Sequence, residues 1–188
     1  MQSTLVIFSG LPGTGKSTLA DKLARKLRWP LLRIDHVIGE VPENAGFEFW
    51  DSKVAILLGL LETQLEIGIS VIADSVFMNK DRNIAQEIAR RHQAGFRPIH
   101  TFVSDEKVWE ERVRMRSNES NHKYVATWEQ ILHQRGHFRK WEPEAALFID
   151  SLNAFDRNYE AVLNFVMKDA VYLKPMPDLP LVEGKYHV

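Results

Sequence analysis

The sequence predicts an α/β fold in which helices cover both faces of a parallel sheet. Five short apolar runs, typical of buried parallel strands, alternate with segments of helical periodicity. The first run passes directly into a glycine-rich loop and then into a helix. Two of the runs end in a carboxylate, at the edge where ligands of such sheets bind.

Length and composition bound the possible classes of protein. The 188 residues, 45% of them apolar, suit one domain with a proper core. The 24 Lys and Arg nearly balance the 25 Asp and Glu, so the net charge does not indicate a nucleic-acid-binding protein. A local basic groove is compatible with this balance. Disulfides and thiolate metal sites are excluded because there is no cysteine. The first apolar run is too short for a signal or membrane segment, so we expect a cytoplasmic protein.

The first strand, expected at residues 4–8, leads into the most specific motif of the chain. Residues 10–18, GLPGTGKST, match G-x-x-x-x-G-K-[ST] at every required position. Helical spacing follows from Lys16 to Leu27, where Trp29 and Pro30 end the pattern. The order of strand, loop and helix favours a phosphate-binding loop over a glycine-rich turn without a ligand.

The residue types of this loop explain the chemistry that we expect. Glycines let successive backbone N–H groups close around a polyphosphate at a helix N-terminus. Lys16 would reach the β- and γ-phosphates, and the Ser17 hydroxyl would ligate Mg²⁺. ATP and Mg²⁺ are therefore the expected cofactors, with a nucleotide-binding set of Gly10, Pro12, Gly13, Thr14, Gly15, Lys16, Ser17 and Thr18.

The second strand, expected at residues 31–35, ends in Asp35 and precedes an irregular loop or flap at residues 36–46. Asp35 either orients an acceptor hydroxyl and takes its proton or caps the turn before His36. Arg33 either binds an anionic substrate or forms a surface salt bridge.

A long helix is expected over residues 50–65, closed by Gly68, and a third strand over residues 69–74. Asp74, at the end of this strand, either supports Mg²⁺ directly or through water, or caps the next turn. We expect Asn79 to cap the following helix. Arg82 in that helix presents the same alternatives as Arg33.

The fourth strand is expected at residues 98–103, followed by a helix that Ser104 caps and that runs to Arg116. Arg112 and Arg116 lie four residues apart, on one helix face beside a polar segment. They either belong to a lid over the phosphates, at about residues 117–127, or form a solvated face paired with Glu110 and Glu111.

The last elements complete the alternation. Thr127 and Gln130 match a capping box that opens another helix, residues 145–149 form the fifth strand, and residues 159–166 mark the final helix. Prolines at 175, 177 and 180 predict an extended tail, so the domain should span residues 1–170 and the tail 171–188. Trp109, Trp128 and Trp141 are expected to pack between helices rather than to stack on bases.

Residues 10–18, Asp35, the run from Val71 to Asp74, and Arg112 with Arg116 resemble the small P-loop kinases of the nucleoside-monophosphate-kinase and shikimate-kinase type. More closely, the chain is similar to bacterial single-domain ATP-binding proteins labelled AAA-type, which relate to polynucleotide and zeta-toxin-type kinases. The resemblance spans residues 1 to about 168. It implies a three-layer α/β/α P-loop NTPase fold with five parallel strands in the order 2-3-1-4-5.

The resemblance also implies roles for individual residues. Arg112 would lie near the adenine, Arg116 would lie on the phosphates, and Asp35 would bind the acceptor. Contacts to the base would come from Ser151, Leu152 and Asn153. The chain departs from shikimate kinases in having no second acid two residues from Asp35, and from adenylate kinases in having no long lid, so neither substrate is carried over.

The sequence thus predicts a monomeric or homodimeric kinase that moves the γ-phosphoryl of MgATP to a small-molecule or nucleotide acceptor. Lys16, Asp35 and Arg116 are the expected catalytic residues, and Ser17 and Asp74 the expected metal ligands. Two other functions stay open. One is a nucleotide-dependent ATPase switch or partner-binding protein without a transferable acceptor, and the other is a nucleic-acid 5′-hydroxyl kinase.

Overall fold

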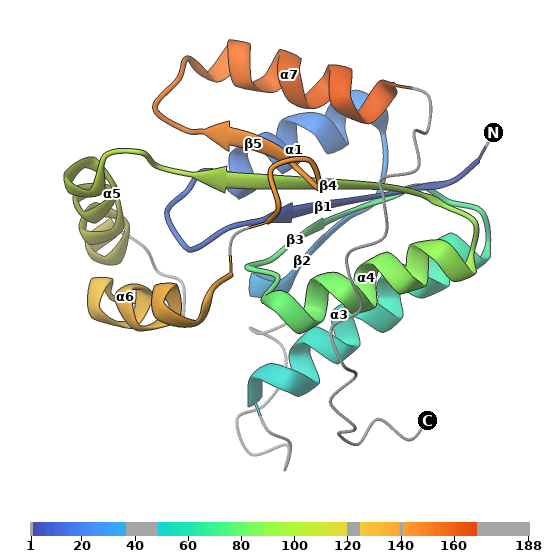
Figure 1. Ribbon diagram of the computed structural model, residues 1–188, viewed down its shortest axis with the longest axis horizontal. Coiled ribbons are helices and arrows are strands. Elements are labelled where there is room, and N and C mark those ends of the chain that lie inside the picture. Colours follow the sequence, from blue (N-terminus) through green and yellow to red (C-terminus); the bar gives the residue numbers. More distant parts are fainter. Residues whose placement is uncertain (1, 37–48, 120–124, 140, 169–188) are drawn as a thin grey trace.

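The computed structural model describes residues 2–36, 49–119, 125–139 and 141–168 and contains one five-stranded parallel sheet (Figure 1). Its order, β2-β3-β1-β4-β5, confirms the predicted P-loop NTPase topology. The strands are β1 (Thr4–Ser9), β2 (Leu31–Arg33), β3 (Val71–Asp74), β4 (Gly95–Phe102) and β5 (Leu147–Asp150).

Helices cover both faces of this sheet, as Figure 1 shows. One face carries α1 (Lys16–Leu27) and α7 (Phe155–Met167), and the other carries α3 (Phe49–Glu66) and α4 (Asn79–Arg91). Two further helices, α5 (Glu106–Glu119) and α6 (Trp128–His137), lie beyond the carboxyl ends of the strands. No described helix is long and apolar enough to cross a membrane.

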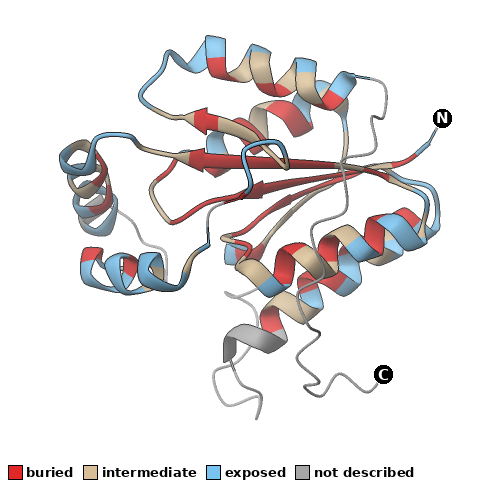
Figure 2. Cartoon of the chain, in the orientation of Figure 1, coloured by how far each residue is buried: buried red, intermediate tan, exposed pale blue. Residues whose placement is uncertain are grey.

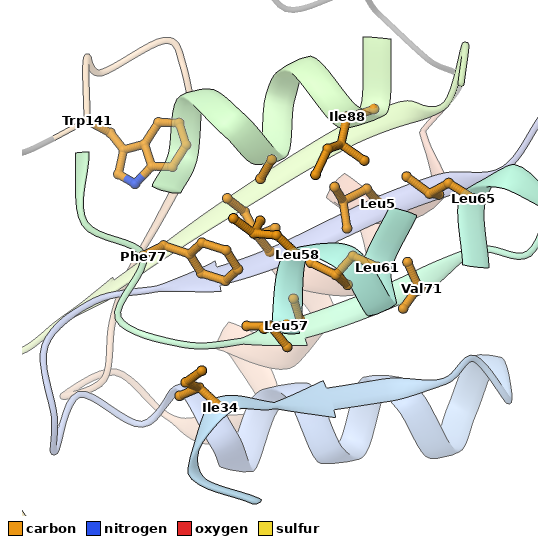
Figure 3. Close-up of a cluster of buried hydrophobic side chains, with 14 residues drawn as sticks. Leu5, Ile34, Leu57, Leu58, Leu61, Leu65, Val71, Phe77, Ile88 and Trp141 are labelled. Carbon is orange, nitrogen blue, oxygen red and sulfur yellow. The ribbon is translucent and has the colours of Figure 1, made fainter. Parts of the chain in front are cut away.

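The core has two layers because successive side chains of β1 point to opposite faces of the sheet. Leu5 and Ile7 pack with α3 and α4, in the cluster drawn in Figure 3, while Val6 and Phe8 pack with α1 and α7. All four side chains are fully buried, and Figure 2 shows the central strands as the most buried part of the chain. The central strand is thus fixed on both sides, and its carboxyl end carries the glycine loop.

A third, smaller cluster joins α5 and α6 to that loop. It consists of Leu11, Trp109, Val113, Trp128 and Ile131, and we call it the α5–α6 cluster. The indole rings of Trp109 and Trp128 meet edge to face at 5.0 Å, a favourable aromatic geometry. Burial of Trp109, Trp128 and Trp141 agrees with the packing role predicted for them, although Trp141 lies outside any helix.

The second strand is shorter than predicted. It ends at Arg33, which pairs with Asp74, the last residue of β3. With no further partner backbone, the chain turns into helical conformation over residues 34–36, so Asp35 lies just beyond the strand rather than at its end. Of the predicted flap at residues 36–46, all but His36 lies outside the described residues, as does the predicted tail at 171–188.

Two predicted helix caps are wrong. Met78, not Asn79, precedes α4, and its N–H donates to the Asp81 carboxylate at 3.0 Å. In α5 the cap is Asp105 instead of Ser104, because Asp105 Oδ1 accepts from the N–H groups of Lys107 and Val108 at 2.9 and 3.2 Å. Each prediction placed the cap next to the residue that supplies it.

The capping box of α6 is confirmed. Gln130 N–H donates to Thr127 Oγ1 at 3.3 Å, and Thr127 N–H donates to Gln130 Oε1 at 2.9 Å. The predicted lid at about 117–127 begins inside α5, which continues to Glu119, and residues 120–124 lie outside the described part of the chain.

Candidate active site

The loop at residues 10–18, called the P-loop below, has three glycines with positive φ, and two of them also leave no room for a Cβ. Gly10 and Gly13 have φ values of 139° and 80°. A Cβ on Gly10 would lie 2.3 Å from the Thr101 carbonyl oxygen, and one on Gly13 would lie 2.8 Å from Val113 Cγ2. The loop is therefore held closely between the end of β4 and α5.

The hydroxyl groups of Thr14 and Thr101 help to fix the P-loop. Thr14 Oγ1 donates to the Leu11 carbonyl at 2.8 Å and lies 2.7 Å from Thr101 Oγ1. Within the P-loop, Gly15 is the N-cap of α1 and makes no side-chain cap hydrogen bond. The first N–H groups of α1 are thus not capped by a side chain, and a helix N-terminus of this kind suits an anion.

Lys16 and Asp74 are buried charges at this helix N-terminus. Lys16 Nζ donates to the Leu11 carbonyl at 3.0 Å, and burial lowers the pKa of Lys16 although the charges of Asp74 and Asp35 oppose this shift. Burial likewise raises the pKa of Asp74, against the charge of Lys16 and a hydrogen bond from Ser17. The P-loop lysine, the P-loop serine and the β3 carboxylate therefore form one electrostatic group.

Asp35, just after β2, and Arg116, on α5, approach each other beside Lys16. Arg116 Nη2 lies 3.7 Å from Asp35 Oδ2, and both side chains are half exposed. Asp35 and Arg116 also act on the pKa of Lys16. The structure thus brings together three residues predicted to be catalytic, on the β2 side, on α1 and on α5.

Arg112 lies one turn before Arg116 and contacts the loop between β5 and α7. Its Nη1 donates to Ser151 Oγ at 2.7 Å, and its Nη2 donates to the Ser151 carbonyl at 3.3 Å. The same loop borders the P-loop, because a Cβ on Gly15 would lie 3.4 Å from Ser151 Cβ. Asn153 follows in this loop, where its N–H donates to the Asp150 carbonyl at 3.1 Å.

For the arginines of α5 the alternatives were a lid over the phosphates and a solvated face paired with Glu110 and Glu111. The ion pairs of this helix bear on that choice. Arg114 pairs with Glu110 at 2.7 Å, as an exposed helix face would. Arg112 and Arg116 instead reach out of the helix, toward Ser151 and Asp35. Glu110 therefore pairs with Arg114, and not with Arg112 or Arg116.

A family model described as an AAA domain matches residues 5–141 of the chain, which include the P-loop, Asp35, Asp74, Arg112 and Arg116. The chain belongs to this AAA domain family. No curated protein matches the sequence.

Solved structures of other proteins share the fold of this AAA domain. Kti12 of Chaetomium thermophilum, in complex with ADP-AlF3, is 13% identical with a TM-score of 0.69, over 86% of this chain and 98% of that one. A gluconokinase of Sinorhizobium meliloti is 17% identical (0.65; 88% and 91%). The APS kinase CysC of Mycobacterium tuberculosis, in complex with AMPPNP and APS, is 18% identical (0.61; 87% and 97%).

Arg33 and Arg82 were both considered as arginines that could bind an anionic substrate, and the structure shows what each of them contacts. Arg33 Nη2 forms a salt bridge with Asp21 at 2.9 Å, the second of its two predicted alternatives. Arg82 is 1% exposed, so it lies neither in a surface salt bridge nor open to a substrate. Burial lowers the pKa of its guanidinium to about 10.

Sequence reasoning missed Trp109 and Thr101 as parts of the AAA domain's P-loop environment. Trp109 Nε1 donates to the Pro12 carbonyl at 2.8 Å, and Thr101 Oγ1 contacts Thr14. The available signal was their position, since Trp109 and Val113 lie four apart on α5 and Thr101 lies near the end of β4. Neither residue type indicates a loop contact by itself.

Proposed function

We propose that this AAA domain is a kinase that transfers the γ-phosphoryl group of MgATP to a small-molecule or nucleotide acceptor. The observation that supports it most is the approach of Asp35 to Arg116, at 3.7 Å, around Lys16. Transfer to a hydroxyl needs a carboxylate at the acceptor beside cations at the phosphates. A nucleotide switch without an acceptor does not need that carboxylate.

In this proposal the P-loop and the first turn of α1 bind the triphosphate. The N–H groups that follow Gly15 face the phosphates, and Lys16 exchanges the Leu11 carbonyl for a phosphate oxygen. Ser17 and Asp74 offer the hard oxygen ligands that suit Mg²⁺, which would neutralise charge on the β- and γ-oxygens when bound. Arg112, with Ser151 and Asn153, borders the base.

Asp35 and Arg116 act at the reacting groups. The Asp35 carboxylate accepts a hydrogen bond from the acceptor hydroxyl, orients it in line with the γ-phosphorus and takes its proton. The Arg116 guanidinium moves from Asp35 to the transferring phosphoryl oxygens, where planar donors offset developing charge. Their half-exposed ion pair is weak enough to open when substrates enter.

The similar structures support an acceptor smaller than a macromolecule. Two of them are named as kinases, a gluconokinase and an APS kinase, and one APS kinase complex holds AMPPNP with APS. Kti12 with ADP-AlF3 supports nucleotide binding by this fold without naming an acceptor. ATP hydrolysis without transfer is therefore the competing outcome.

The test is a screen of sugars, sugar acids, nucleosides and nucleotides as acceptors with γ-labelled ATP. For an accepted compound, Asp35→Asn should lower kcat by about 100-fold or more because the base is lost. The affinity for MgATP should stay within about threefold, since Asp35 does not bind the donor.

Asp156→Asn is the matched control. This exposed aspartate pairs with Lys22 on the other side of α1, so transfer should remain at the wild-type rate. Undiminished transfer by Asp35→Asn would show that Asp35 is not the base. Steady ATP hydrolysis with no labelled product from any acceptor would overturn the kinase proposal in favour of the ATPase.

A further inference from the structure

Arg82 is a buried cation that the proposed chemistry does not use. Its side chain is 1% exposed, and its described hydrogen bonds go to two backbone carbonyls, from Nε to Phe77 at 2.8 Å and from Nη1 to Arg139 at 2.7 Å. The Nη2 atom has no hydrogen-bond partner among the described residues. A buried charge lowers the stability of a protein unless its partners offset the loss of hydration, so the partners of Arg82 are informative.

Several partners of Arg82 lie between α6 and β5. The chain leads from α6 back toward β5 through a stretch that we call the return segment. It consists of His137, Phe138, Arg139 and Trp141. Arg82 lies against the rings of Phe138 and Trp141, with its guanidinium carbon 4.4 and 4.7 Å from the ring centroids. Figure 3 shows Trp141 beside the first turn of α4.

Asn79 holds the same segment one turn earlier. Its Nδ2 donates to the His137 carbonyl at 3.4 Å, and its Oδ1 accepts from Arg139 N–H at 3.1 Å. The first turn of α4 thus binds the return segment through two side chains. Because β3 leads into this turn, the return segment is tied to the strand that carries Asp74.

The return segment in turn contacts β1 and β4 near their carboxyl ends. Trp141 Nε1 donates to Ser9 Oγ at 2.8 Å, and the Phe138 ring stacks on His100 at 5.5 Å. Ser9 and His100 are paired in the β1–β4 register, and Ser9 directly precedes Gly10. A continuous set of contacts therefore runs from Arg82 through the return segment to the start of the P-loop.

We propose that Arg82 is a positioning residue that fixes the return segment, and with it α6 and α5, relative to the P-loop. The consequence for the reaction rests on the kinase function proposed above. Arg116 lies on α5, which packs on α6 through the α5–α6 cluster. Loss of the Arg82 contacts should therefore leave Arg116 less precisely placed for the transferring phosphoryl group. The P-loop should still bind nucleotide.

Two readouts test this proposal, and the first does not depend on any reaction. The chain has no cysteine, so Leu132→Cys on α6 and Glu160→Cys on α7, both at exposed positions, give a unique pair of spin labels. In Arg82→Met, which keeps an apolar stem against the rings, the distance distribution between the labels should broaden. Arg90→Met is the matched control, because Arg90 is exposed on the same helix and pairs with Glu87.

The second readout separates positioning from folding and from donor binding. Arg82→Met should lower kcat by about tenfold or more, since small misplacement of a reacting group is costly, while the Kd for AMPPNP stays within about threefold. Arg82→Lys keeps the charge without the two-pronged donor geometry and should not restore kcat. Should Arg82→Met fail to fold, Asn79→Ala removes two contacts to the same segment and should shift both readouts in the same direction.

An unchanged distance distribution in folded Arg82→Met, or in Asn79→Ala where Arg82→Met does not fold, would overturn the positioning role. A broadened distribution in a protein that transfers phosphate to no acceptor would refute the kinase function and leave the positioning role standing.

Discussion

The lysine of the P-loop is held by the loop itself. Lys16 Nζ and Thr14 Oγ1 both donate to the Leu11 carbonyl, which therefore accepts two hydrogen bonds. Lys16 is 8% exposed, and burial lowers its pKa, so its charged form is less stable in the folded protein than in water. A phosphate would supply the countercharge that this position otherwise takes from Asp74 and Asp35.

Replacement of Lys16 should separate binding from stability. Because a lowered pKa means that the charged lysine opposes folding at neutral pH, Lys16→Met should leave the thermal midpoint unchanged or raise it. Nucleotide affinity should fall by about 100-fold or more with loss of the charged donor. Calorimetry and thermal unfolding measure the two quantities.

Lys22→Met serves as the control on the same helix. Lys22 pairs with exposed Asp156, so both quantities should stay near the wild-type values. A Lys16→Met midpoint lower by more than about 5 °C would contradict the assignment of Lys16 as a cost to folding.

Residue roles were predictable from the sequence only where a motif defines them. The P-loop positions follow from glycine spacing, and Lys16 and Ser17 from the motif's last two positions. Arg82 was not predictable, because its hydrogen-bond partners are backbone carbonyls and one of them, Arg139, is 57 positions away. A backbone carbonyl leaves no trace in residue type, so only tertiary structure shows such a contact.

Among the elements that are not continuous with the P-loop, α5 contacts it through two side chains. Trp109 donates to the Pro12 carbonyl, and Val113 limits the space beside Gly13. Arg112 and Arg116 leave the same helix toward Ser151 and Asp35. The helix that carries these arginines is therefore built directly on the loop that carries Lys16.

Gly13→Ala should disturb this contact. Its Cβ would lie 2.8 Å from Val113 Cγ2 at a φ of +80°, so the loop or α5 must shift. We expect nucleotide affinity to fall by about tenfold or more and stability to drop by about 1–3 kcal/mol, measured by calorimetry and chemical denaturation.

Gly136→Ala is the control in α6, where a Cβ would meet nothing within 4 Å. It should leave stability unchanged or raise it by about 0.5 kcal/mol, because Gly136 lies in the last turn of α6 and alanine favours helix over glycine. Adding Val113→Ala to Gly13→Ala should recover part of the affinity by making room. No recovery in the double variant would assign the defect to backbone strain at Gly13 and to the Trp109 indole, which lies 3.2 Å from the added Cβ, rather than to Val113.

Element positions followed from periodicity, but element ends did not. The range predicted for α1, Lys16 to Leu27, is the range observed. The end of β2 depends on where its neighbour β3 ends, and the caps of α4 and α5 depend on which of two adjacent residues lies at the helix N-terminus, Met78 or Asn79 in α4 and Ser104 or Asp105 in α5. Such choices are made by neighbouring backbone, which a single segment does not specify.

At the scale of the whole molecule, the alternation of strands and helices was sufficient to predict the class, while strand order came from the resemblance. The gathering of Asp35, Lys16, Asp74 and Arg116 follows from parallel topology, which collects every strand's carboxyl end at one edge. The exact pairing of Asp35 with Arg116 depends on how α5 packs, and spacing alone does not give that.

The same strand order divides the chain at the turn of residues 92–94. Strands β2, β3 and β1 are neighbours that all precede this turn, and β4 and β5 are neighbours that follow it. Lys16, Asp35 and Asp74 lie in the first part, and Arg112 and Arg116 in the second. The protein is therefore a natural candidate for fragment complementation, in which residues 1–93 and 94–188, co-expressed, co-purify and bind AMPPNP together but not separately. A cut at residues 68–69 forces β3 to insert between β2 and β1, so those fragments should reassemble poorly, and the reverse ranking would refute this division.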